Sequence, residues 1–331
     1  MTKCFSFTAS RDWWYRYIFS YAGLKSVTTN LGEGTTMHCW IPKIIKPAKP
    51  NLVLIHGFGA NAMWQWGNYL RPLIPRFNVY VPDLLFFGES YTTHLERTEH
   101  FQAQCLKKLM ESFQVQKMSF VGVSYGGFVG YSLASQYPDA IEKVILCCSG
   151  VCLEEKDMKD CLFKVSDLDE AASILLPQTP DKLRTLVKMS FVKPAAAKTV
   201  PSYFLLDFIE VMCTHYIEEK RDLIQNILKD RHFADLPKIS QPTLIVWGEE
   251  DQVFPLELGY RLKRHLGDNA ELVVIKNAGH AVNLEKTKEF LKHLKAFLID
   301  NGIDNGTVHD QNSHNSVNDN IDSKNSENNR N

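Results

Sequence analysis

A serine flanked by glycines is the sharpest chemical feature of the chain. It lies in Gly122-Val-Ser124-Tyr-Gly126, directly after an apolar run that ends at Val121 and before a helix-compatible stretch. A G-x-S-x-G pattern between a strand and a helix is typical of a nucleophile elbow, a sharp turn that closes only when its flanking positions lack side chains. The N-terminus of the following helix places partial positive charge beside the serine. Ser124 is therefore the predicted nucleophile of an acyl-transfer reaction.

A serine hydroxyl needs a general base, and the base needs an acid that orients it. Asp251 follows the apolar run 243–247, and His280 follows the run 271–275. The order Ser, Asp, His fits this kind of site, and all three residues come where strands end, the edge at which open α/β sheets bind ligands. We predict that His280 is the base and that Asp251 orients it.

Other roles for these residues stay open in the sequence. Glu250 could be the acid in place of Asp251. Asp251 could instead cap the helix that begins near Pro255, and His280 could cap the last helix, because short polar side chains and turn histidines often serve helix termini.

Negative charge that develops on the substrate requires pre-aimed backbone N–H groups. The loop His56-Gly-Phe58-Gly59 follows the first buried run, and we predict that the N–H groups of Phe58 and Tyr125 form the oxyanion hole. This loop lacks the G-x-G-x-x-G spacing of a dinucleotide site, and the chain has neither an HExxH pattern nor paired carboxylates for a metal. No cofactor and no metal are expected.

Short apolar runs alternate with helix-compatible stretches. The runs are continuous rather than alternating, which indicates strands covered on both faces, as in a parallel sheet between helices. An α/β fold with a mostly parallel sheet is predicted. The expected strands are 51–56, 77–81, 117–121, 144–148, 243–247 and 271–275, the expected helices are 94–113, 125–137, 256–266 and 285–299, and an antiparallel opening hairpin is expected from 27–31 and 36–41.

The stretch 151–236 interrupts this alternation with helix-like segments punctuated by prolines. It is too long for a loop, so we predict a helical lid inserted between two strands, although its apolar residues could simply pack a small core of their own. Residues 1–45 would hold an aromatic segment and the opening hairpin, 46–150 and 237–300 the two parts of the α/β core, and 301–331 an acidic tail with ten Asn, which is expected to be disordered.

Composition excludes several classes of protein. The chain has 331 residues and a net charge of −1, which argues against a nucleic-acid binder. Charged residues interrupt the first 20 positions, where a secretory signal would need an apolar run, so a cytoplasmic, non-secreted protein is expected. The eight scattered cysteines show no CxxC pair and fit a reducing compartment.

Residues 11–21 combine Trp13, Trp14, Tyr15, Tyr17 and Tyr21 with two arginines. Such a segment could make peripheral membrane contact, because aromatic side chains favour the membrane interface. We favour the alternative, a short helix that packs its rings onto the core or the lid.

These motifs, together with Pro82-Asp83-Leu-Leu-Phe-Phe-Gly88-Glu-Ser90, resemble those of the α/β-hydrolase superfamily. Within it the chain is similar to plant monoacylglycerol-lipase-like serine hydrolases and to the related meta-cleavage C–C hydrolases. The opening, with Arg11-Asp-Trp-Trp14, is similar to a plant subgroup. Ser124 speaks against epoxide hydrolases and dehalogenases, which usually carry Asp at this position.

The resemblance implies a serine hydrolase that cleaves a carboxylic ester, such as a monoacylglycerol, through an acyl-enzyme on Ser124. Its expected partner is a small-molecule ester or lipid. Two alternatives remain: C–C bond hydrolysis of a diketone or dienoate with the same residues, and a ligand-sensing receptor on the same fold with slow turnover.

Overall fold

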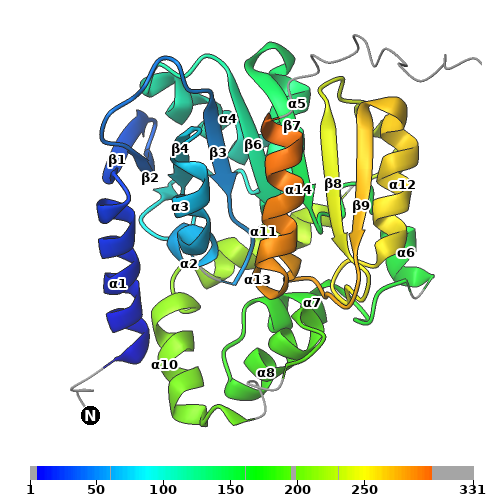
Figure 1. The fold of residues 1–331 in the computed structure, drawn as a ribbon. Helices are drawn as coiled ribbons and strands as arrows, with labels where there is room; N and C mark the ends of the chain where they lie inside the picture. The colour runs from blue at the N-terminus through cyan, green and yellow to red at the C-terminus, as the bar shows by residue number, and fades with distance from the viewer. Residues whose placement is uncertain (1–5, 60, 161, 195–198, 230, 300–331) are drawn as a thin grey trace, which may run out of the picture.

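The computed structural model describes residues 6–59, 61–160, 162–194, 199–229 and 231–299. Its centre is a sheet in the order β1-β2-β4-β3-β6-β7-β8-β9, with the short β5 paired to β2. Helices lie on both faces of this sheet, and a further group of helices lies below it in the view of Figure 1. The predicted α/β class with a mostly parallel sheet is confirmed, and the tail 301–331 lies outside the described residues.

The parallel strands lie at the predicted apolar runs, because such runs can be covered on both faces. Pairing is parallel from β4 to β9, while β1 and β2 form the antiparallel hairpin, which is longer than predicted at both ends. The strands are β1 (Leu24–Gly32), β2 (Thr35–Pro42), β3 (Asn51–Ile55), β4 (Asn78–Pro82), β5 (Tyr91–Thr92), β6 (Met118–Val123), β7 (Ile141–Cys147), β8 (Thr243–Gly248) and β9 (Ala270–Ile275).

Two predicted helices differ from the observed ones, and capping explains the first difference. The helix expected from residue 94 begins at Glu99, because the Thr98 side chain accepts the backbone N–H of Phe101 and ends the extended segment before it. The helix expected over 285–299 begins at Thr287, after a separate short helix that ends at Glu285. Helices of the core are α2 (Ala62–Trp66), α3 (Leu70–Leu73), α4 (Glu99–Ser112), α5 (Tyr125–Gln136), α12 (Leu256–Leu266), α13 (Val282–Glu285) and α14 (Thr287–Ile299).

Helices alone, with no strand among the described residues, connect β7 to β8. They are α6 (Glu155–Lys159), α7 (Leu168–Leu175), α8 (Pro180–Ser190), α10 (Ser202–Met212) and α11 (Ile217–Leu228). In Figure 1, α7, α8 and α10 lie together below the sheet.

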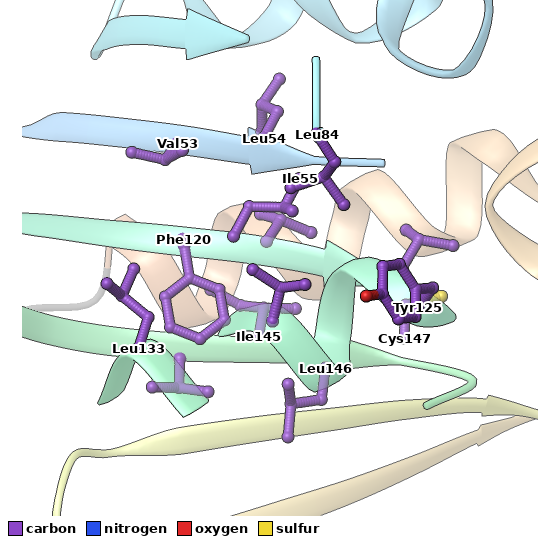
Figure 2. Packing of buried hydrophobic residues seen from close by; sticks show 14 of the residues in the cluster. Val53, Leu54, Ile55, Leu84, Phe120, Tyr125, Leu133, Ile145, Leu146 and Cys147 are labelled. Carbon is purple, nitrogen blue, oxygen red and sulfur yellow. The ribbon is translucent and has the colours of Figure 1, made fainter. Parts of the chain in front are cut away.

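The core lies on both sides of the central strands. Figure 2 shows Val53 and Ile55 of β3 beside Phe120 of β6 and Ile145 of β7, all fully buried. Gly130 of α5 allows close approach, since a Cβ there would lie 2.2 Å from the Phe120 ring. These contacts hold β3 and β6, and thus the loops that follow them, in fixed positions.

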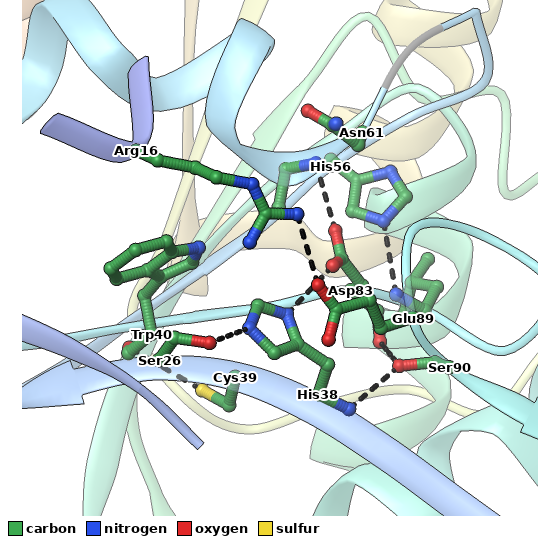
Figure 3. A network of polar contacts seen from close by, with 12 residues as sticks. Arg16, Ser26, His38, Cys39, Trp40, His56, Asn61, Asp83, Glu89 and Ser90 are labelled. Carbon is green, nitrogen blue, oxygen red and sulfur yellow. Dashed lines mark hydrogen bonds and ion pairs between the residues drawn. The ribbon is translucent and has the colours of Figure 1, made fainter. Parts of the chain in front are cut away.

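A buried polar network joins the loops after β3 and β4 (Figure 3). The Asp83 carboxylate accepts hydrogen bonds from the backbone N–H of Ala62 at 3.0 Å and from His38 Nδ1 at 2.8 Å, and His38 Nε2 lies 2.8 Å from Ser26 Oγ. His56 Nε2 accepts the backbone N–H of Leu84 at 3.0 Å. Burial would raise the pKa of Asp83, but hydrogen bonding to His38 and the charge of that ring outweigh it and hold the pKa below its usual value.

The aromatic segment near the N-terminus forms helix α1 (Phe7–Tyr21), which stands against the β1–β2 side of the molecule (Figure 1). It buries Tyr15 and Phe19, as the packing alternative predicts, but leaves Trp13 and Tyr21 exposed. No helix within the described ranges has the length and apolar character needed to span a bilayer.

Candidate active site

Ser124 stands at the turn between β6 and α5, in the strained backbone conformation that an elbow requires. Its φ of 52° lies in the region that favours glycine, and the backbone of Cys147 and the hydroxyl of Ser149 hold its own N–H and C=O at 2.9 and 2.8 Å. A Cβ at Gly122 would lie 2.5 Å from the carbonyl oxygen of Gly126. The glycines of the motif are therefore a steric requirement of the turn.

The structure brings Ser124, His280 and Asp251 into one hydrogen-bonded chain. His280 Nε2 lies 2.9 Å from Ser124 Oγ, and His280 Nδ1 lies 2.9 Å from Asp251 Oδ2. An ionised carboxylate only accepts, so Nδ1 carries the proton and Nε2 is free to accept the serine proton. The Asp251 carboxylate is buried.

The structure shows no contacts that would support the alternative roles of Glu250, Asp251 and His280. Glu250 points to solvent, while the other oxygen of Asp251 accepts the N–H groups of Val253 and Phe254 at 2.8 and 2.9 Å. Helix α12 begins after Pro255 without a side-chain cap, and the two ring nitrogens of His280 contact Asp251 and Ser124 rather than the start of the last helix. Asp251 therefore stabilises its own turn and holds the imidazole, and it does not cap α12.

The loop after β3 packs directly against the elbow. A Cβ at Gly57 would lie 3.0 Å from Ser124 Cβ, and the N–H of Gly57 is bonded to the Gln65 side chain at 2.8 Å. Tyr125 is the first residue of α5, where helical N–H groups lack intrahelical partners. The rings of Phe58 and Tyr125, the two residues predicted to supply the oxyanion donors, lie 5.0 Å apart across this junction.

Sequence reasoning missed a carboxylate that ties the histidine loop to the helices below it. Glu285 of α13 accepts the N–H of Gly279 at 2.9 Å and that of Val192 at 3.1 Å. Ser190, at the end of α8, accepts the N–H of Ala281 at 2.9 Å. No motif marks Glu285, because its partners are backbone groups that only the fold brings near.

A cavity opens beside Ser124 and His280, with about 1050 Å³ of space outside protein atoms, part of it open solvent. No Lys or Arg is among the described residues of its wall, which come from α2, α7, α8, α10 and the loops just described. The wall is mostly apolar and includes Phe58, Trp64, Leu175, Leu183, Leu186, Val187, Phe191 and Phe208.

A second apolar cavity, with about 650 Å³ of space outside protein atoms, part of it open solvent, is lined by residues of α7 and α8 and shares Leu175 and Leu186 with the first. We call it the side chamber. Its wall also includes Met189 and Phe254, and the Phe254 ring centroid lies 5.6 Å from that of His280. The two apolar cavities therefore share part of one wall, and the side chamber comes close to the His280 ring.

Cys148 is a further side chain close to His280 that has a possible metal ligand atom. Its sulfur and ligand atoms of Asp251 and His280 lie within 4.8 Å of one another. Burial raises the pKa of the Cys148 thiol well above its ordinary value, which keeps it protonated, and a metal here would have to displace the Asp251–His280 hydrogen bond.

A comparison with protein families gives the class to which this fold belongs. The family model for the alpha/beta hydrolase fold matches residues 50–287, and the chain belongs to this family. The predicted resemblance to α/β hydrolases is confirmed.

Two sequence relatives are named for different substrates. The chain is 24% identical over 263 residues to monoacylglycerol lipase ABHD6 of Bos taurus, a match that covers 76% of this chain and 75% of that protein. It is 24% identical over 261 residues to a 2-hydroxy-6-oxononadienedioate/2-hydroxy-6-oxononatrienedioate hydrolase of Paraburkholderia xenovorans, covering 75% and 86%. Both sequence relatives are hydrolases, so this chain is of a hydrolase family.

A solved structure agrees with the fold. A bacterial membrane phospholipase A superposes with a TM-score of 0.70 at 24% identity, and the match covers 90% of this chain and 91% of that one. At this identity the likeness shows a shared fold alone.

Proposed function

We propose that the protein is a serine hydrolase that cleaves a carboxylic ester. Ser124 Oγ attacks the ester carbonyl while His280 Nε2 takes its proton, and Asp251 stabilises the imidazolium. His280 then gives that proton to the departing alcohol. Water, activated by the same imidazole, splits the acyl-enzyme and releases the acid. The single observation that carries this proposal is the pair of 2.9 Å contacts that links the three side chains.

The N–H groups of Phe58 and Tyr125 are the proposed oxyanion donors. Support comes from the contact between Gly57 and the elbow, which holds the two backbones together. Donors fixed before the reaction need no reorganisation as charge develops, and each one typically lowers the barrier by about 3 kcal/mol.

The proposed ester is lipophilic, of the monoacylglycerol kind. The cavity wall supports this, because its described residues are mostly apolar and include no cation that would attract a carboxylate. Similarity to monoacylglycerol lipase ABHD6 points the same way. We assign helices α6 to α11 the role of a lid, since α7, α8 and α10 each contribute to that wall.

A second candidate is hydrolysis of a C–C bond, favoured by the similarity to the Paraburkholderia hydrolase. The substrate named for that hydrolase is a dioate, which carries a carboxylate at each end. A wall without Lys or Arg among its described residues offers that carboxylate no charged partner, which ranks this candidate below ester hydrolysis.

Fluorophosphonate labelling tests the proposal. We expect label on Ser124 of the wild type, competed by monoacylglycerols, and none on Ser124→Ala. Ester turnover of Ser124→Ala should fall by about 10⁵-fold or more. Ser132→Ala, on the next turns of α5, is the control and should keep full turnover. Full turnover by a clean preparation of Ser124→Ala, or competition by dienoates alone, contradicts ester hydrolysis at this serine.

Peripheral membrane contact through residues 11–21 is part of the same proposal. A lipophilic ester is concentrated in bilayers, and α1 leaves Trp13 and Tyr21 exposed to any surface that approaches it.

A further inference from the structure

Helix α1 has two unlike faces. One face, with Thr8, Tyr15 and Phe19, is buried against the body of the protein. The opposite face leaves the large rings of Trp13 and Tyr21 67% and 83% exposed. With 3.6 residues per turn, Trp13, Tyr17 and Tyr21 follow one another along this outer face.

The exposed rings continue from α1 onto the neighbouring helix α10. We call this set the aromatic surface: Phe7, Trp13, Trp14, Tyr17 and Tyr21 of α1, with Tyr203 and Phe204 of α10. Trp13 and Tyr17 stack with centroids 6.4 Å apart, Tyr17 and Tyr21 at 6.0 Å, and Phe7 meets Phe204 edge-on at 5.8 Å. Because the rings already hold one another in place, little side-chain entropy is lost when the surface is covered.

The chemistry of these side chains fits a lipid surface. Trp and Tyr combine a large apolar body with a polar tip, and they concentrate where water meets hydrocarbon. Several large apolar side chains exposed on neighbouring helices are typical of an interaction site.

Charge on the same side favours anionic lipids. The Lys43 ammonium lies 2.7 Å from the carbonyl oxygen of Ser20 at the end of α1, and the next residue, Ile44, is 76% exposed. Arg11 of α1 is exposed as well, with its guanidinium over the Tyr15 and Trp64 rings at 5.5 and 5.8 Å. Three carboxylates in or beside α1 are bonded within the protein: Asp12 and Glu89 pair with Arg16, and Asp207 accepts the N–H of Thr8.

We propose that the aromatic surface, with the cations beside it, docks the enzyme onto an anionic lipid bilayer. This inference rests on the proposed function, for which it names the physical source of the substrate. The surface lies on the membrane without crossing it, because its helices present one apolar face only.

The docked surface is joined to the cavity beside Ser124. On α10, Phe204 belongs to the aromatic surface, and Phe208, one turn later, lines the cavity and contacts the Trp64 ring at 5.7 Å. On α1, Asp12 accepts the Asn61 side chain at 2.9 Å and the Trp64 indole N–H at 3.2 Å. Docking would therefore place one wall of the cavity directly at the lipid.

Vesicle flotation tests the proposal with the full chain. The probes are vesicles of phosphatidylcholine alone and of phosphatidylcholine with phosphatidylglycerol. The triple variant Trp13→Ser/Trp14→Ser/Tyr17→Ser should lose at least about tenfold in partitioning, because three rings no longer leave water. Tyr260→Ser is the matched control: this tyrosine is 43% exposed, but it lies on α12, at the far end of the sheet. Lys43→Glu should weaken binding to the anionic vesicles and not to the neutral ones.

Soluble-ester turnover separates this inference from the proposed function. The triple variant should keep wild-type turnover of a water-soluble p-nitrophenyl ester and lose turnover of ester presented in vesicles. Active wild type that does not float overturns the docking proposal and leaves the hydrolase intact. A wild-type dimer that the triple variant converts to a monomer in sedimentation also overturns it, since the surface would then cover a second copy. Wild type that floats without hydrolysing any ester contradicts the proposed function instead.

Discussion

The Asp207 carboxylate of α10 accepts the backbone N–H of Thr8 in α1 at 2.7 Å, across 199 positions of sequence. Thr8 lies in the first turn of α1, where N–H groups lack helical partners and a negative charge is favourable. One bond thus satisfies a helix terminus and fastens the N-terminal helix to the helices over the active site. Ser6 caps the same terminus through the N–H of Ala9 at 3.0 Å.

Loss of the Asp207 carboxylate should loosen α1. Asp207→Ala leaves a buried N–H without its acceptor, which we expect to cost about 1–3 kcal/mol of unfolding free energy. Amide exchange should speed up in the first turns of α1. Asp207→Asn keeps an acceptor oxygen and should retain most of the stability. Unchanged exchange in Asp207→Ala would show that packing alone holds the helix.

The two adjacent acids after β8 should differ sharply in their effect on turnover. Asp251→Asn removes the charge that stabilises the His280 imidazolium, and we expect kcat to fall by about 10⁴-fold. Glu250→Gln, the matched control one residue away, should stay near the wild-type value because its side chain is exposed. Steady-state kinetics with a soluble ester measures both, and a reversed order would assign the acid to Glu250.

The side chamber should set the preference for chain length. Met189→Trp adds bulk to its wall, and each methylene that no longer leaves water costs about 0.8 kcal/mol, or roughly fourfold in kcat/KM. We expect long-chain esters to lose at least about tenfold in kcat/KM and acetate esters to be unaffected. Lys188→Trp, the exposed neighbour on α8, is the control. An equal loss for all chain lengths would mean that the chamber is not used by the acyl chain.

His56 should make the fold sensitive to mild acid. Burial lowers the pKa of His56 below its ordinary value, and its Nε2 must stay unprotonated to accept the N–H of Leu84. The unfolded chain takes up a proton near its ordinary pKa while the folded chain does not. Stability is thus fully present above about pH 6.5 and falls by up to about 1.4 kcal/mol per unit below it, until the folded pKa is reached.

Urea unfolding at about pH 7.5 and about pH 5.5 measures this loss. His56→Gln can still accept the Leu84 N–H and carries no titrating group, so its two midpoints should differ less than those of the wild type. His232→Gln, at an exposed position, should behave like the wild type. Equal pH dependence in all three proteins would remove His56 as the cause.

Local sequence predicted the central strands and the elbow because each is specified by a few adjacent residues. A run such as 243–247 must be buried on both faces, and the glycines around Ser124 are required by the turn itself. Sequence spacing also placed Asp251 and His280 at the correct edge of the sheet, since residues that follow parallel strands meet there.

Contacts that depend on the tertiary fold were out of reach. Glu285 bonds backbone groups of two distant loops, and Asp207 accepts the N–H of a residue 199 positions earlier in the chain. Neither position has a distinctive neighbourhood in the chain. The sequence also did not predict which rings of α1 are exposed. An aromatic-rich segment has the same sequence pattern whether its rings are buried or exposed, and only its packing partners decide between the two.

The network in Figure 3 contains a second array of the same three residue types, in which Ser26, His38 and Asp83 are linked by contacts of 2.8 Å. Its side-chain distances match those of Ser124, His280 and Asp251 to within 0.1 Å. Ser26, however, lies inside β1, opposite Trp40 in an antiparallel ladder, with no helix terminus after it. A covalent serine probe should therefore label Ser124 and leave Ser26 unlabelled. Ser26 is thus a built-in negative control, because it has the same side-chain partners on a different backbone.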